Sequence, residues 1–274
     1  MDLLLSVFLG LALLVGMGWV GLQVEPKGFP PHPEKTRDRG RVELPSGLPA
    51  PVRRYFEAAL DGQAPKIESV VLWGRGRLRI KGLWFPVRFK AYYLPGRSFS
   101  RQMEITWFGL PVLRGVDSYI DGRGGLKITG LINLEETGEK IDQAQNLVLW
   151  GEAIWTPSVY LTDPRVRWEA VDEKTAQLVV PFGGREETFL VRFDPQTAMI
   201  REMSALRFRG QEEAKTPWRV ECLDWKPFHG VMVPTCVVGH WADEKGPYVV
   251  MTVEGLEYNV DVSEVLPAEE APPS

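Results

Sequence analysis

The residue with the clearest chemical potential in this sequence is Glu152. It lies in the segment 139–155, and at ~100° per residue it falls about 20° from Ile141, at the border of an apolar helical stripe. The stripe residues are Ile141, Ala144, Val148 and Trp155. A carboxylate in such a position needs a partner, because its burial is otherwise unfavourable. The sequence therefore predicts either a polar anchor inside a pocket or a structural ion pair with an arginine of a neighbouring sheet.

Asp117 and Tyr119 are the other residues that suit acid–base chemistry. They alternate in a predicted strand, so their side chains project to the same face. A carboxylate pair with a nearby phenol can transfer protons. An enzyme centred on Glu152, Asp117 and Tyr119 is therefore one alternative function.

The histidines and cysteines do not form a recognisable metal, redox or hydrolase motif. His32, His229 and His240 lie in a predicted linker, a turn and a strand, without HExxH spacing. The two cysteines, Cys222 and Cys236, lack CxxC spacing, and no GxSxG elbow accompanies the histidines. The sequence predicts no metal site and no cofactor.

Cys222 and Cys236 flank a predicted hairpin, and its loop length decides their relation. A three-residue loop, Phe228–Gly230, pairs Cys222 with Cys236 and makes them a disulfide candidate in an oxidising compartment. A two-residue turn, His229–Gly230, instead pairs Cys222 with Val237.

The aromatic content points to a large core or an apolar pocket. The chain has 10 tryptophans, and most lie in or beside predicted strands and helices. Aromatic side chains line pockets for apolar ligands as readily as they fill cores. We expect a cavity between the 139–155 helix and the sheet. Its expected ligand-binding residues are Phe89, Met103, Ile105, Trp107, Val148, Glu152 and Trp155.

The elements that position these residues are mostly strands. A short amphipathic helix is predicted at 52–60, and a second one at 139–155. Between and after them, apolar and polar residues alternate, which is typical of antiparallel strands with one buried face. The predicted strands include 112–120, 125–131, 166–172, 176–182, 187–193, 199–208, 218–226, 231–241 and 247–260.

This order predicts a mainly β fold with two helices. One large curved antiparallel sheet, a half-barrel with the helices against its concave face, satisfies the one-sided patterning. A closed β-barrel is the alternative. The predicted organisation is an anchor at 1–24, a Pro-rich spacer at 25–47, an antiparallel β domain at 48–266 and a disordered tail at 267–274.

The anchor prediction rests on an uncharged apolar run from residue 3 to residue 24. As a helix it extends ~33 Å, enough for a hydrocarbon core of about 30 Å. A cleavable signal peptide is the competing interpretation, but Asp2 replaces the usual basic start and no Ala-x-Ala site follows. We therefore expect a single-pass membrane protein, with the membrane as a partner. The flanking charges leave the side of the domain open.

Composition limits the partners. Lys+Arg 32 against Asp+Glu 36 gives a formal net charge of −4, which disfavours nucleic acid. No feature of the sequence identifies a protein partner.

Several short motifs carry a resemblance to a known family. In chain order they are Leu48-Pro-Ala-Pro-Val-Arg-Arg-Tyr-Phe56, Gly115-Val-Asp-Ser-Tyr119, Asp121-Gly122, Glu152-Ala-Ile-Trp-Thr-Pro157, Gly230-Val-Met-Val-Pro234 and Trp241. Together they resemble an uncharacterised bacterial membrane-anchored domain family. The layout also resembles the half-barrel of lipoprotein-localisation factors, which bind acyl chains or act as envelope sensors.

Three functions follow as expectations. The first is a membrane-anchored, non-enzymatic binding module for a lipid-like or other apolar ligand. The second is an envelope protein-interaction or sensor domain with a filled core. The third is the enzyme centred on Glu152, Asp117 and Tyr119.

Overall fold

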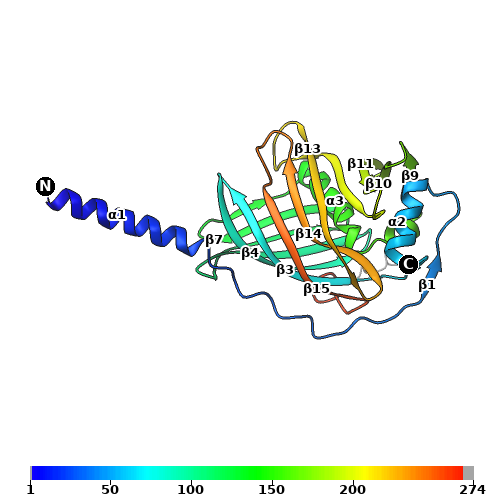
Figure 1. Ribbon diagram of the computed structural model, residues 1–274, viewed down its shortest axis with the longest axis horizontal. Coiled ribbons are helices and arrows are strands. Elements are labelled where there is room, and N and C mark those ends of the chain that lie inside the picture. Colours follow the sequence, from blue (N-terminus) through cyan, green and yellow to red (C-terminus); the bar gives the residue numbers. More distant parts are fainter. Residues whose placement is uncertain (1, 268–274) are drawn as a thin grey trace, which may run out of the picture.

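The N-terminal helix projects away from the rest of the protein. The computed structural model describes residues 2–267, and helix α1 (Asp2–Gly21) extends to one side of a large sheet (Figure 1). Among the described residues, no helix combines the length and the apolar character that a membrane span requires. This finding contradicts the predicted single-pass membrane localisation. The predicted transmembrane anchor and the membrane as a partner gain no support from it.

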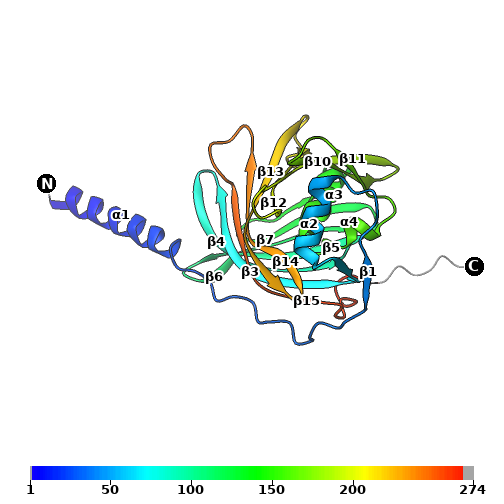
Figure 2. The same ribbon diagram turned by 45° about the vertical axis from the view of Figure 1, so that its right-hand side comes forward.

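The Pro-rich segment after α1 lies along the sheet. It runs beneath the strands in both views (Figures 1 and 2) and ends in β1 (Arg41–Glu43), which pairs with β2 (Gln63–Pro65). Glu257 holds it by accepting hydrogen bonds from the Thr36 hydroxyl at 2.7 Å and the Thr36 amide at 2.8 Å. The segment therefore packs on the domain. Apart from Pro267, the predicted disordered tail lies outside the described residues.

The main body is one open antiparallel sheet of 13 strands. The N-terminal arm contains β3 (Val70–Ile80), β4 (Leu83–Leu94), β5 (Ser98–Trp107), β6 (Leu110–Ile120), β7 (Arg123–Gly130) and β8 (Leu134–Glu136). The C-terminal arm contains β9 (Arg167–Ala170), β10 (Thr175–Phe182), β11 (Arg185–Phe193), β12 (Ile200–Phe208), β13 (Lys215–Phe228), β14 (Val231–Trp241) and β15 (Val249–Tyr258). Each arm is a meander, and the arms join where β15 pairs with β3. The predicted single antiparallel sheet is confirmed, and the closed barrel is wrong.

Two-residue turns set the register of several hairpins. At the β13–β14 turn, His229 and Gly230 have φ of 49° and 80°, the left-handed backbone of a type I′ turn. This turn pairs Cys222 with Val237 and Leu223 with Cys236. The two cysteines therefore point to opposite faces, and both are free thiols. The pairing expected from a three-residue loop, and with it the disulfide candidate, is wrong.

The helices cover one face of the curved sheet (Figure 2). Helix α2 (Ala50–Leu60) packs on β10 and β14, whereas α3 (Glu139–Glu152) contacts β6 and β7 of one arm and β10 and β12 of the other. A 3₁₀ turn (Ala153–Trp155) and the short α4 (Val159–Thr162) follow. Because α3 bridges the two arms, the concave face beneath it becomes the floor of a cavity.

Candidate functional site

A cavity of about 330 Å³ lies between α3 and the concave face of the sheet. Its sheet side is formed by residues at every second position of β5, β6, β7, β13, β14 and β15. The pairs Arg101–Asp117, Met103–Gly115 and Ile105–Leu113 are directly opposed on β5 and β6. The period-two pattern of these strands therefore directs one continuous set of side chains into the cavity.

Many of the apolar side chains that line this floor are incompletely covered. Val237 and Met251 are buried, but eight others are only half-buried. They are Leu78, Met103, Ile105, Leu113, Leu126, Ile128, Val220 and Val249. A core strand normally buries this face completely. The helices therefore leave apolar surface available inside the cavity.

Helix α3 presents Gln145, Val148, Glu152 and, after its last turn, Trp155 to the cavity. The start of the helix is fixed to β7, because the Gly124 amide donates to Asp142 Oδ1 at 2.7 Å. A Cβ at Gly124 would lie 2.5 Å from the Ile141 carbonyl oxygen, so only glycine permits this close approach. The helix is therefore held at a defined height above the floor.

A buried ion cluster occupies one part of the cavity wall. Arg101 forms ion pairs with Glu152 and, from the neighbouring strand, with Asp117. The Tyr93 hydroxyl donates to Glu152 Oε2 at 2.5 Å. The expected ion pair between Glu152 and an arginine of the sheet is therefore confirmed. The cluster connects α3 to β4, β5 and β6.

Burial dominates the electrostatics of this cluster. It raises the pKa of Glu152, an effect that Arg101 and the Tyr93 hydrogen bond oppose and Asp117 reinforces. Burial and the negative charge of Glu152 also raise the pKa of Tyr93. Although burial acts against its charge, the two carboxylates raise the pKa of Arg101. Arg101 therefore stays charged.

The raised pKa of Glu152 predicts a pH dependence of stability. A group whose pKa is raised in the folded protein stabilises the fold below its unfolded pKa, and this contribution is lost as the pH rises through the folded pKa. The free energy of unfolding of the wild type relative to Glu152→Gln should therefore fall as the pH rises above the ordinary range of a glutamate. Urea denaturation at a series of pH values measures this difference. A difference that is constant with pH would contradict the raised pKa.

Arg207 enters the cavity from β12, and no carboxylate of the described part of the chain pairs with it. Its Nε donates to the Ala144 carbonyl oxygen at 3.1 Å. The guanidinium lies over the rings of Trp218 and Trp241, at 4.8 and 5.4 Å from their centroids. Burial lowers the pKa of Arg207. Cation–π contact offsets part of the cost of burying the charge but leaves the terminal nitrogens free to bind.

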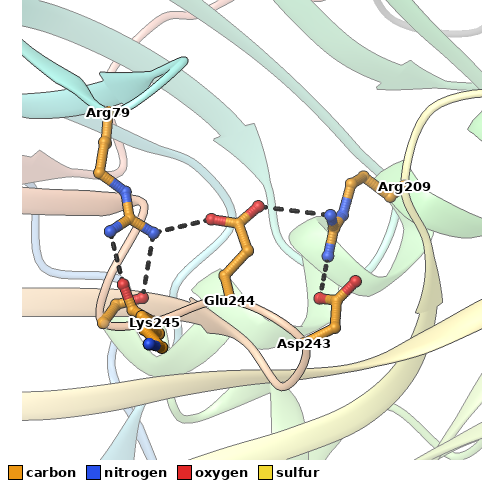
Figure 3. A network of polar contacts seen from close by, with 6 residues as sticks. Arg79, Arg209, Asp243, Glu244 and Lys245 are labelled. Atoms are coloured by element: carbon orange, nitrogen blue, oxygen red, sulfur yellow. Dashed lines mark hydrogen bonds and ion pairs between the residues drawn. The ribbon is translucent and has the colours of Figure 1, made fainter.

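The rim beside Arg207 is fixed by a polar network (Figure 3). Glu244, in the loop between β14 and β15, bridges Arg79 and Arg209 at 2.8 and 3.3 Å. Arg209 also pairs with Asp243, and Arg79 donates to the Lys245 carbonyl oxygen at 2.6 Å. The loop ends at Tyr248, a cavity residue whose hydroxyl accepts a hydrogen bond from Trp218 Nε1 at 3.0 Å. The network therefore holds one wall of the cavity in place.

The structure brings together most of the residues that the sequence predicted for ligand binding. Met103, Ile105, Val148, Glu152 and Trp155 all line the cavity. Two others do not.

Phe89 and Trp107 are the two exceptions. Phe89 is fully buried, and its Cζ would lie 2.8 Å from a Cβ at Gly74, so its ring fills the space over that glycine. Trp107 is 42% exposed, because the pairing of β5 with β6 becomes irregular after Ile105. Its Nε1 donates to the Gly18 carbonyl oxygen at 3.1 Å, at the end of α1.

The proposed catalytic set is divided. Asp117 and Glu152 share the guanidinium of Arg101. Tyr119 lies two residues further along β6 and lines a separate cavity that includes Arg165 and Asp121. The structure therefore does not bring Tyr119 together with Asp117 and Glu152 around one point.

Sequence reasoning missed the two arginines of the cavity. In the alternating pattern, Arg101 shares its strand face with Phe99 and Met103. Arg207 likewise shares its strand face with Met203 and Ala205. An arginine on the apolar face of an alternating strand was the available signal. Gly115 gave no comparable signal, because a glycine in a strand has many structural causes.

Comparison with known protein families places the chain in one of them. Residues 40–253 match the model of DUF6544, described as a family of unknown function. No curated protein matches the sequence. The predicted resemblance to an uncharacterised domain family is confirmed.

Three solved structures show similarity to this chain at low sequence identity. A LolA superfamily protein from Nitrosomonas europaea is 10% identical, with a TM-score of 0.48 over 80% of this chain and 98% of that one. A putative outer membrane lipoprotein-sorting protein domain from Vibrio parahaemolyticus is 6% identical, with a TM-score of 0.42 over 78% and 91%. A DUF1329 family protein from Desulfovibrio piger is 11% identical, with a TM-score of 0.45 over 80% and 95%.

Proposed function

The chain belongs to DUF6544, a family of unknown function, and we propose on the strength of its cavity that it is a binding module for an apolar, lipid-like ligand. The ligand lies between α3 and the concave face of the sheet. The protein binds it without chemical conversion.

The observation that carries this proposal is the half-buried apolar floor. Side chains from both arms face a space of about 330 Å³, within the size range of small-molecule sites. Covering apolar surface contributes about 25 cal/mol per Å² removed from water. An apolar ligand therefore gains free energy from surface that the protein itself leaves uncovered.

The two alternatives have less support. A sensor domain with a filled core does not account for the uncovered floor. An enzyme centred on Glu152, Asp117 and Tyr119 is disfavoured, because Arg101 engages both carboxylates and Tyr119 lines another cavity.

Gly115 provides a direct test, because its missing side chain leaves room in the cavity. A Cβ at this position meets its nearest atoms, two backbone oxygens, only at 3.9 and 4.0 Å, so a larger residue fits without a backbone clash. Gly115→Leu is expected to weaken binding of the neutral fluorophore N-phenylnaphthylamine about tenfold or more, by occupying its volume. Thermal stability should be unchanged or higher, because the leucine fills a void. Fluorescence titration and thermal unfolding measure the two effects.

The matched control is Val116→Leu, the next residue of the same strand. Val116 is 41% exposed and faces away from the cavity, so this variant should bind the fluorophore as the wild type does. Absence of saturable binding to the wild type, or equal binding by the Gly115→Leu variant, would refute the proposed function.

A further inference from the structure

Arg207 differs from the other arginines of the cavity and its rim in its lack of an acidic partner. Arg101 engages Asp117 and Glu152, and Arg209 engages Asp243 and Glu244. No carboxylate among residues 2–267 lies within ion-pair distance of the Arg207 guanidinium. Asp117 and Glu152 act on it only from beyond hydrogen-bond distance. The nearest acidic groups are therefore already committed to Arg101.

The surroundings of Arg207 define a polar point within an apolar space. Its Nε donates a hydrogen bond to the Ala144 carbonyl oxygen, and its guanidinium lies over the rings of Trp218 and Trp241. These contacts fix the guanidinium in place and leave its two terminal nitrogens without partners among the described residues. A guanidinium with free terminal nitrogens matches the oxygens of a carboxylate or phosphate.

We propose that Arg207 binds the oxyanion head of an amphiphile, a carboxylate or a phosphate monoester, whose hydrocarbon chain occupies the apolar cavity. This inference rests on the proposed function and specifies the ligand class. The head supplies the negatively charged partner that Arg207 lacks. The chain covers the half-buried floor formed by residues such as Met103, Ile105 and Val220.

The geometry also explains why the head and the chain occupy different parts of the cavity. Arg207 lies beside Ala144 in the first half of α3, whereas the Arg101 cluster contacts Glu152 in its last turn. Eight residues separate these two positions on the helix, a rise of about 12 Å. The carboxylates of that cluster repel an oxyanion. The head is therefore held at Arg207, at a distance from Glu152.

Competition against N-phenylnaphthylamine tests the proposal with four probes on the full-length protein. Dodecanoate and dodecyl phosphate carry an oxyanion, dodecanol has the same chain with a neutral head, and inorganic phosphate has no chain. We expect both anionic amphiphiles to bind more tightly than dodecanol, and inorganic phosphate not to compete. The tighter of the two anionic probes identifies the head.

Arg207→Gln should weaken binding of the anionic probes by about tenfold to a hundredfold, the usual range for a charge-assisted hydrogen bond. Binding of N-phenylnaphthylamine should change by less than about twofold. Arg207→Lys keeps the positive charge but loses the two parallel N–H donors of the guanidinium, so its affinity for the anionic probes should lie between those of the wild type and Arg207→Gln. Arg201→Gln is the matched control, because Arg201 is an exposed arginine on the same strand.

Equal affinity of the wild type for dodecanoate and dodecanol would overturn the role of Arg207, even if the Arg207→Gln variant failed to fold. If Arg207→Gln lowered the affinity for the neutral and the anionic probes equally, this result would also overturn the role of Arg207, because the residue would then only pack against the tryptophans. In both cases the neutral fluorophore still binds the wild type and the proposed function stands. If the fluorophore does not bind the wild type, the proposed function itself fails.

Discussion

Arg101→Met is expected to lower the free energy of unfolding by about 3–5 kcal/mol. The substitution keeps most of the side-chain volume but leaves Asp117 and Glu152 without their shared cation. Two carboxylates close together in a buried site repel each other and lose hydration, so the cost exceeds that of a missing contact. Urea denaturation of the purified variant at neutral pH measures the change.

The charge explanation has its own control. Combining Arg101→Met with Asp117→Asn and Glu152→Gln removes the stranded charges, so this triple variant should recover much of the lost stability. Lowering the pH should also reduce the deficit of Arg101→Met, because both carboxylates then take up protons. A deficit that is the same in the triple variant and at every pH would show that Arg101 acts through packing alone.

Trp155→Ala is expected to destabilise the protein by about 3–5 kcal/mol. Trp155 is 1% exposed, and its Nε1 donates to the Pro234 carbonyl oxygen at 3.0 Å. Its own carbonyl oxygen accepts a hydrogen bond from the Tyr258 hydroxyl at 2.8 Å. The substitution therefore enlarges the cavity, and it leaves the Pro234 acceptor without its donor. Denaturant unfolding measures the loss.

Trp107→Ala is the matched control for this prediction, because it removes the same side chain from an exposed position. Its effect should stay below about 1 kcal/mol. Equal losses for the two variants would contradict the assignment of Trp155 to the core and of Trp107 to the surface.

Much of the fold could be predicted from local patterns. The 139–155 helix is present as α3 and its 3₁₀ extension, and the alternating segments are strands close to their predicted bounds. The periodicity of apolar residues is a local property of the sequence, so it predicts helices and strands without knowledge of the elements they pack against. The strand order that joins β3 to β15 depends on contacts between distant residues and is absent from the local pattern.

The candidate site was predicted less completely for the same reason. Glu152 could be expected to need a partner, but its identity as Arg101 depends on how β5 lies beneath α3. In the alternating pattern, Trp107 belongs to the same strand face as the cavity residues Met103 and Ile105. Only the irregular pairing at the end of the β5–β6 hairpin brings it to the surface. The disulfide prediction was wrong because the hairpin loop is one residue shorter than the three-residue loop it required. A shift of one residue in strand register moves a side chain to the other face of the sheet, so Cys222 pairs with Val237 instead of Cys236.

The pairing of β15 with β3 has a consequence for how the chain is completed during synthesis. Strand β15 follows the other strands of the sheet in the described part of the chain, yet it lies in the middle of the sheet rather than at its edge, as the orange-red strand beside the cyan strands shows (Figure 1). Each meander can form from neighbouring hairpins, but their two inner edges meet only when β15 is available. Contacts between such distant segments form slowly, and unpaired edges invite aggregation until then. A chain that stops before Val249 would therefore have its sheet split into two arms, whereas a chain lacking an outer strand would only have a narrower sheet.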